Sequence, residues 1–173
     1  MKWLWLSGVI ILLDQWTKNI AEQALVLHQP IAVTPFLNMT LMHNYGAAFS
    51  LFNDAGGWQR WFFIGLAVLV SVGIIVWLKI ASAGNLWLQI ALSLVVGGAV
   101  GNLWDRIALG YVVDFADLHF GEFRPFLIFN VADAAITIGV VIVLARAFFM
   151  GDKDKAEVDG LMNSKAADAA ESK

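Results

Sequence analysis

The segment that decides the fold begins with VVDF at residues 112–115 and ends with FNVAD at residues 129–133. Asp133 lies just inside an apolar run that continues to about Met150, which is long enough to cross a bilayer. A carboxylate in such a span costs roughly 2.5–3.5 kcal/mol at a helix centre, and less near the interface. It is therefore a functional candidate when a partner can be named, and we expect Asp114 in the preceding connection to be that partner.

The composition is that of a membrane protein. Of 173 residues, 60% are hydrophobic and only 14% are charged, whereas soluble domains are nearer half apolar and a quarter charged. Cysteine is absent, which excludes disulfides and thiolate catalysis. The net charge is −3, and no basic patch is interleaved with aromatic residues, so nucleic-acid binding is not expected.

Four apolar segments predict four membrane spans in a single domain, residues 1–150. The spans cover about residues 3–25, 58–78, 86–108 and 126–149. The first span contains Asp14 and Lys18, which are four residues apart, share a helix face and can neutralise each other. No cleavage site of the A-x-A type follows Leu13, so this segment is interpreted as a retained helix. Residues 151–173 lack an apolar stripe and predict a disordered tail.

The connections between the spans are not helical in pattern. Leu37, Met39 and Leu41 alternate with polar residues, which predicts a short strand, and residues 110–118 predict another. The half-apolar loop at residues 44–57 is interpreted as a lid that lies on the membrane surface.

The third span combines close packing with polar side chains. Gly97 and Gly101 form a small-xxx-small pair that favours close helix packing. One turn later come Asn102, Asp105 and Arg106, of which Asn102 and Arg106 face the same way as Gly98.

Alternating crossings place all the charges within the spans at the same membrane face. These charges are Asp14, Lys18, Asp105, Arg106 and Asp133. The opposite halves of the spans are almost entirely apolar, so a single polar site at one face is the simplest interpretation. The positive-inside rule favours cytoplasmic termini, but only by five basic residues to four.

Two carboxylates that share a site cannot both ionise cheaply, so the pair holds one proton. That state suits peptide hydrolysis, because the ionised member takes a proton from water while the protonated member polarises the carbonyl. Asn130 lies three residues before Asp133, on the same helical face, where its amide can orient a carboxylate. Asn44, Asn102 and Arg106 are predicted at the same face and strengthen the hypothesis.

Other chemistries have weaker support. A Ser–Lys peptidase would need Ser50 to meet Lys18. Asp114, Asp117 and His119 could be read as metal ligands, but no H-E-x-x-H motif is present. We interpret His119 as an interfacial residue and Asp117 as a solvated loop charge.

Non-enzymatic functions also remain open. A small proton-coupled carrier would use intramembrane carboxylates as relays, and it would spread polar residues through the bilayer depth rather than confine them to one face. An assembly factor could use the Gly97/Gly101 pair for helix association.

The chain resembles the bacterial lipoprotein signal peptidases (signal peptidase II), which are aspartic peptidases of the inner membrane. Five blocks carry the resemblance, which extends to about Met150: DQWTK at 14–18, NYGAAFS at 44–50, GAVGNLWDR at 98–106, VDF at 113–115 and FNVAD at 129–133. It implies that Asp114 and Asp133 are the catalytic pair. The residues implied to shape or support the site are Asn44, Gly46, Asn102, Arg106, Asn130, Asp14 and Lys18.

The resemblance also implies the architecture and the substrate. The fold would be an all-α membrane protein with four transmembrane helices, cytoplasmic termini, and a small antiparallel sheet and lid on the periplasmic side. The substrate would be a prolipoprotein with diacylglycerol on its lipobox cysteine, cut just before that cysteine, while its lipid stays in the bilayer. No metal or organic cofactor is expected, and the protein is expected to be monomeric.

Overall fold

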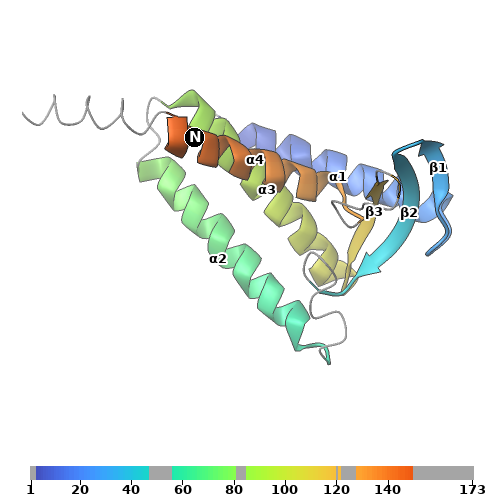
Figure 1. The fold of residues 1–173 in the computed structure, drawn as a ribbon. Helices are drawn as coiled ribbons and strands as arrows, with labels where there is room; N and C mark the ends of the chain where they lie inside the picture. Colours follow the sequence, from blue (N-terminus) through green and yellow to red (C-terminus); the bar gives the residue numbers. More distant parts are fainter. Residues whose placement is uncertain (1–2, 47–55, 81–84, 120, 122–127, 150–173) are drawn as a thin grey trace, which may run out of the picture.

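The described part of the chain is mostly helical, with one small sheet. Figure 1 shows the fold in a computed structural model, which describes residues 3–46, 56–80, 85–119, 121 and 128–149. Its elements are α1 (Leu4–Ala24), β1 (Ile31–Thr34), β2 (Leu37–Asn44), α2 (Trp58–Ile80), α3 (Leu86–Ala108), β3 (Val112–Leu118) and α4 (Val131–Phe149). Most of the predicted lid and all of the predicted tail lie outside the described residues.

The sheet is antiparallel, with the strand order β1-β2-β3, and it lies at one end of the helices (Figure 1). Both predicted strands are present as β2 and β3, whereas β1 was not predicted as a separate strand. The side chains of Leu41, Val113 and Phe115 pack against Ala21 near the end of α1. This small core fixes β2 and β3 relative to α1, and thereby fixes the position of Asp114 on β3.

The helix α3 packs against the other three helices, and its glycines allow unusually close contacts. A Cβ atom on Gly98 would lie 2.3 Å from the carbonyl oxygen of Ala132 in α4. A Cβ atom on Gly97 would lie 3.0 Å from the backbone of Ser7 in α1, and one on Gly101 would lie 2.7 Å from Asp14 Oδ2. The prediction that Gly97 and Gly101 serve close packing is therefore confirmed, with α1 as the partner.

The described residues include three helices that are long and apolar enough to cross a membrane: α2, α3 and α4. The helix α1 is 21 residues long, but it carries Asp14, Lys18 and Glu22. Towards the sheet, α2 diverges from α4, while it keeps its contact with α3 (Figure 1).

The fourth helix begins at Val131, later than the predicted start of the fourth span near residue 126. Phe129 pairs with Ala116 of β3 through backbone hydrogen bonds of 2.8 and 3.0 Å, which holds it in an extended conformation. Asn130 then caps the helix, because its Oδ1 accepts the N–H of Asp133 at 2.9 Å. The apolar run therefore includes Phe129, which pairs with β3 and lies before the helix.

We expect Gly98→Ala to destabilise the protein, because the added methyl group would collide with the backbone of α4. Overpacking of this kind typically costs about 1–3 kcal/mol. Gly65→Ala on α2 is the matched control, since a Cβ atom there has no heavy atom within 4 Å. The midpoint of thermal unfolding in detergent should fall for Gly98→Ala and stay unchanged or rise for Gly65→Ala. Equal midpoints for the two variants would contradict the packing described above.

Candidate active site

Two amide side chains join the carboxylates of Asp114 and Asp133. Asn130 Nδ2 donates to Asp114 Oδ1 at 2.6 Å, and Asn102 Nδ2 donates to Asp133 Oδ1 at 2.7 Å. Asn130 Nδ2 also lies 3.2 Å from Asn102 Oδ1, so the amides contact each other. The carboxylates, which come from a strand and a helix nineteen residues apart, therefore share one hydrogen-bond network.

Asp133 is held at the start of α4 by a reciprocal pair of hydrogen bonds. Its N–H donates to Asn130 Oδ1 at 2.9 Å, and its Oδ2 accepts the N–H of Asn130 at 3.3 Å. This is the geometry of a capping box, with Asn at the cap and Asp three residues later. The unpaired N–H groups and the dipole at a helix start favour a negative charge there.

Asp114 receives a second amide from β2. Asn44 Nδ2 donates to Asp114 Oδ2 at 3.1 Å, while Asn44 Oδ1 accepts the N–H of Gly46 at 3.0 Å. The register pairs Met42 with Asp114 and Asn44 with Val112. The antiparallel pairing of β2 with β3 thus brings Asn44 beside the acid.

The environment of Asp114 favours its protonated form. The side chain is buried, and this burial, together with the negative charge of Asp133, raises the pKa of Asp114 to about 7. Hydrogen bonds from Asn44 and Asn130 and the charge of Lys18 act in the opposite direction, but they do not cancel the effect of burial. A pair that carries one proton near neutral pH is the state required for acid–base hydrolysis.

Arg106 lies beside the acids but does not pair with either of them. Its guanidinium donates to the carbonyl oxygens of Gly46 at 3.0 Å and Asn102 at 3.3 Å. The guanidinium also lies over the ring of Phe63 in α2, 5.2 Å from its centroid. Arg106 therefore connects α3 to α2 and to the chain that follows β2.

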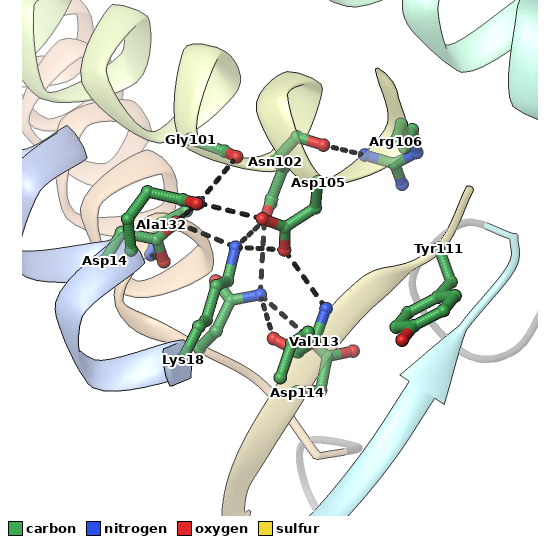
Figure 2. A network of polar contacts seen from close by, with 12 residues as sticks. Asp14, Lys18, Gly101, Asn102, Asp105, Arg106, Tyr111, Val113, Asp114 and Ala132 are labelled. Carbon is green, nitrogen blue, oxygen red and sulfur yellow. Dashed lines mark hydrogen bonds and ion pairs between the residues drawn. The ribbon is translucent and has the colours of Figure 1, made fainter. Parts of the chain in front are cut away.

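Lys18 lies at the centre of a buried polar cluster behind the acids (Figure 2). Its Nζ is 2.7 Å from Asp14 Oδ2 and 2.8 Å from Asp105 Oδ2, and it donates to Asn102 Oδ1 at 2.9 Å. Because the Asn102 oxygen accepts from Lys18, its Nδ2 must face Asp133. The ammonium group thus fixes the orientation of an amide that binds a candidate catalytic carboxylate.

Asp14 supports the site from the same cluster. Its Oδ1 accepts the N–H of Ala132 at 2.9 Å, in the first turn of α4 and next to Asp133. The predicted contact between Asp14 and Lys18 is confirmed. The structure thus brings all the predicted site residues into one network, or next to it.

The interpretation of Asp117 was wrong. Asp117 was interpreted as a solvated loop charge, but it is buried and lies 3.4 Å from Asn38 Nδ2 and from Thr40 Oγ1 on β2. The described residues contain no group of three or more His, Cys, Asp or Glu side chains that could hold a metal ion. Ser50, the nucleophile of the Ser–Lys alternative, lies outside the described residues.

Comparison with known proteins shows the family. The family model for "Signal peptidase (SPase) II" matches residues 6–149. The chain belongs to the signal peptidase II family. A "Lipoprotein signal peptidase" of Alteromonas mediterranea is 44% identical over 169 residues, covering 98% of this chain and 91% of that protein. One from Acinetobacter baumannii is 52% identical over 148 residues, covering 86% of this chain and 84% of that protein.

Solved structures agree with this assignment. A structure described as a bacterial membrane enzyme at 1.9 Å superposes with a TM-score of 0.75 at 30% identity, covering 83% of this chain and 90% of the other. A second, at 2.3 Å, gives a TM-score of 0.73 at 33% identity, covering 80% and 82%. The resemblance inferred from the five sequence blocks is confirmed.

Sequence reasoning did not assign a site role to Asp105 or Gln15. Gln15 Nε2 donates to Asp105 Oδ1 at 2.8 Å and lies 3.2 Å from Asp14 Oδ2. Asp105 was recognised only as one of the charges at the polar face. Its spacing of three residues from Asn102 was the available signal, because that spacing places both side chains on one side of α3.

We expect Lys18→Met to destabilise the peptidase, because Asp14 and Asp105 would be left buried without their shared cation. Removal of one partner from a buried ion pair typically costs about 3–5 kcal/mol. Lys79→Met, at the exposed end of α2, removes the same charge without affecting the cluster. Thermal unfolding in detergent should show a lower midpoint for Lys18→Met alone, and a midpoint equal to that of the control would contradict the role of the ammonium.

Proposed function

We propose that this chain removes the signal peptide from diacylglyceryl-modified prolipoproteins, with Asp114 and Asp133 as its catalytic pair. The observation that carries the proposal is the amide bridge of Asn130 and Asn102, which brings the carboxylates into one network. The curated relatives named lipoprotein signal peptidase supply the substrate class. The bond cut would be the peptide bond just before the lipidated cysteine.

The geometry supports a division of roles between the acids. Asp133, at the helix start, is the ionised member and accepts a proton from a water molecule as that water attacks the scissile carbonyl carbon. Asp114 carries the proton at the outset and donates a hydrogen bond to the carbonyl oxygen, on which negative charge develops. Collapse of the tetrahedral intermediate breaks the C–N bond, and the departing nitrogen takes up a proton from the pair. No metal or organic cofactor enters these steps.

The burial of charge in α1 supports a fourth membrane span. Asp14 and Lys18 are only 0% and 3% exposed, whereas Leu12 and Trp16 on the same helix are 72% and 63% exposed. The ionised groups thus face the protein and the apolar side chains face outwards, as a membrane span requires. The described residues hold three candidate spans, α2, α3 and α4, and α1 would complete the proposed four-span arrangement.

Tryptophans support a membrane boundary close to the acids. Trp58 and Trp61 are exposed at the start of α2, and Trp104 is exposed near the end of α3. Trp77 and Trp87 are exposed at the opposite ends of these two helices. Tryptophan gathers at membrane interfaces, so the acids would lie near one face, where water can reach the scissile bond.

The family and the site support a proposal for the orientation and the assembly. We place the sheet and the acids on the periplasmic side of the inner membrane, with both termini in the cytoplasm. The signal peptide's apolar helix and the lipid would stay in the bilayer while the bond reaches the acids. A single chain supplies the whole network, so a monomer suffices. The confinement of the buried charged side chains of the described residues to one end argues against a proton-coupled carrier.

We expect Asp114→Asn and Asp133→Asn each to lose cleavage by at least about 10²–10⁴-fold, the usual contribution of a positioned acid or base. The measurement is cleavage of a diacylglyceryl-modified precursor by purified, folded protein. Asp117→Asn is the matched control, because Asp117 is also buried on β3 but lies three residues beyond Asp114, beside Asn38 and Thr40 of β2. Normal turnover by either Asp114→Asn or Asp133→Asn would remove the aspartic mechanism.

The cleavage rate should fall at alkaline pH. Because the pKa of Asp114 is about 7, its protonated fraction decreases tenfold for each pH unit above that value. The proposed reaction needs that proton, so kcat should decrease from about pH 7 upwards with a slope approaching one. Single-turnover rates between pH 6 and 9 would measure this, and a rate that still rises at pH 9 would contradict the assignment of the proton.

A further inference from the structure

The carboxylate of Asp105 is buried next to the catalytic pair, and the proposed reaction gives it no role. Its side chain is 2% exposed. Its Oδ1 accepts from Gln15 Nε2 at 2.8 Å, and its Oδ2 accepts from Lys18 Nζ at 2.8 Å and from the N–H of Val113 at 3.1 Å (Figure 2). Asp105 therefore connects α1 and α3 to the residue that precedes Asp114.

The contact with Val113 fixes the backbone of β3 at Asp114. The N–H of Val113 is held by Asp105, and its carbonyl oxygen accepts from Asn130 Nδ2 at 3.2 Å. Both main-chain groups of Val113 are thus bound to side chains from the two helices that carry the site. Asp105 can reach this position because α3 ends just after it in a turn through Gly110, where φ is +92°.

Asp105 also balances the charge of Lys18. One ammonium group faces the carboxylates of Asp14 and Asp105, and it acts on the catalytic pair through Asn102. The charge of Lys18 lowers the pKa of Asp114, so a carboxylate bound to that ammonium limits the decrease. The ion cluster is therefore part of the electrostatic environment of the proton on Asp114.

We infer that Asp105 is a positioning residue of the peptidase, which fixes β3 beside Asp114 and offsets the charge of Lys18 behind the catalytic pair. The inference rests on the proposed function, since it adds a residue that adjusts the same site. It requires that the loss of the Asp105 charge change the chemical step rather than only the amount of folded protein.

The charged groups around Asp105 set the direction of the effect. They are Asp14, Lys18 and Glu22 on α1, Arg106 on α3, Asp114 on β3 and Asp133 on α4. Asp105→Asn removes a negative charge while its remaining oxygen can still accept from Val113 and Lys18. Ionisation of Asp114 then becomes easier, so its pKa falls and the alkaline decline of kcat begins at lower pH.

The experiment compares the pH profiles of kcat and KM for the wild type, Asp105→Asn, Asp105→Glu and Glu22→Gln. For Asp105→Asn we expect the alkaline decline of kcat to shift down by about one pH unit, so that kcat at pH 8 falls about tenfold. KM should change less than about twofold. Asp105→Glu keeps the charge, so the alkaline decline of its kcat should begin at the same pH as in the wild type. Its kcat should nevertheless be lower at every pH, because the longer side chain moves β3. Glu22→Gln removes a charge that lies further out on α1 and should leave the profile unchanged.

An Asp105→Asn enzyme with the wild-type pH profile would overturn the inference, even if less of it folds. If Asp105→Asn does not fold, an Asp105→Glu enzyme with wild-type kcat would overturn it. Failure of the proposed function is distinguishable, because it would appear as normal cleavage by Asp114→Asn or Asp133→Asn. Normal profiles of the Asp105 variants together with inactive Asp114→Asn would remove only the inference about Asp105.

Discussion

The rest of the site depends on the buried contacts of the Lys18 ammonium group. A chain this apolar can bury a charge only if the charge is paired and hydrogen-bonded. Lys18 meets that requirement with the carboxylates of Asp14 and Asp105, and its remaining donor binds Asn102. The same contacts hold α1 against α3 and orient an amide towards Asp133. Stability and the arrangement of the site therefore have a common origin.

The glycines of α3 make this arrangement sterically possible. The carboxylate of Asp14 lies where a side chain at residue 101 would be, and from there it reaches the N–H of Ala132 in α4. At Gly98, α3 touches the backbone of α4 directly. Any side chain at these positions would push apart the helices that carry Lys18, Asn102 and Asp133. The small residues and the polar network are thus one structural feature, because the network needs helices at backbone contact.

Local rules predicted the parts of the fold that depend on neighbours in sequence. The spacing of Asp14 and Lys18 predicted their ion pair, and the alternation in β2 predicted a strand. The four-residue β1 was not predicted. Ile31 and Val33 are both exposed, so the apolar side chains of this strand do not mark a buried face. Asp117 was misjudged because its burial depends on the pairing of β3 with β2, where its contact Asn38 lies 79 residues earlier in the chain. The start of α4 was placed too early because Phe129 is apolar but pairs with Ala116 of β3 in an extended conformation.

The two acids proposed as the catalytic pair are asymmetric because they come from different kinds of secondary structure. Asp133 lies in the first turn of a helix, where backbone N–H groups bind carboxylates. The N–H of Asn130 donates to Asp133 itself, and the N–H of Ala132 donates to Asp14. Asp114 lies in a buried strand, where backbone groups are used by the sheet and, among the described residues, its carboxylate accepts from the amides of Asn44 and Asn130. A helix start supports negative charge in a way that a strand does not. In the proposed mechanism the proton is therefore better placed on Asp114, which leaves Asp133 free to accept a proton from water.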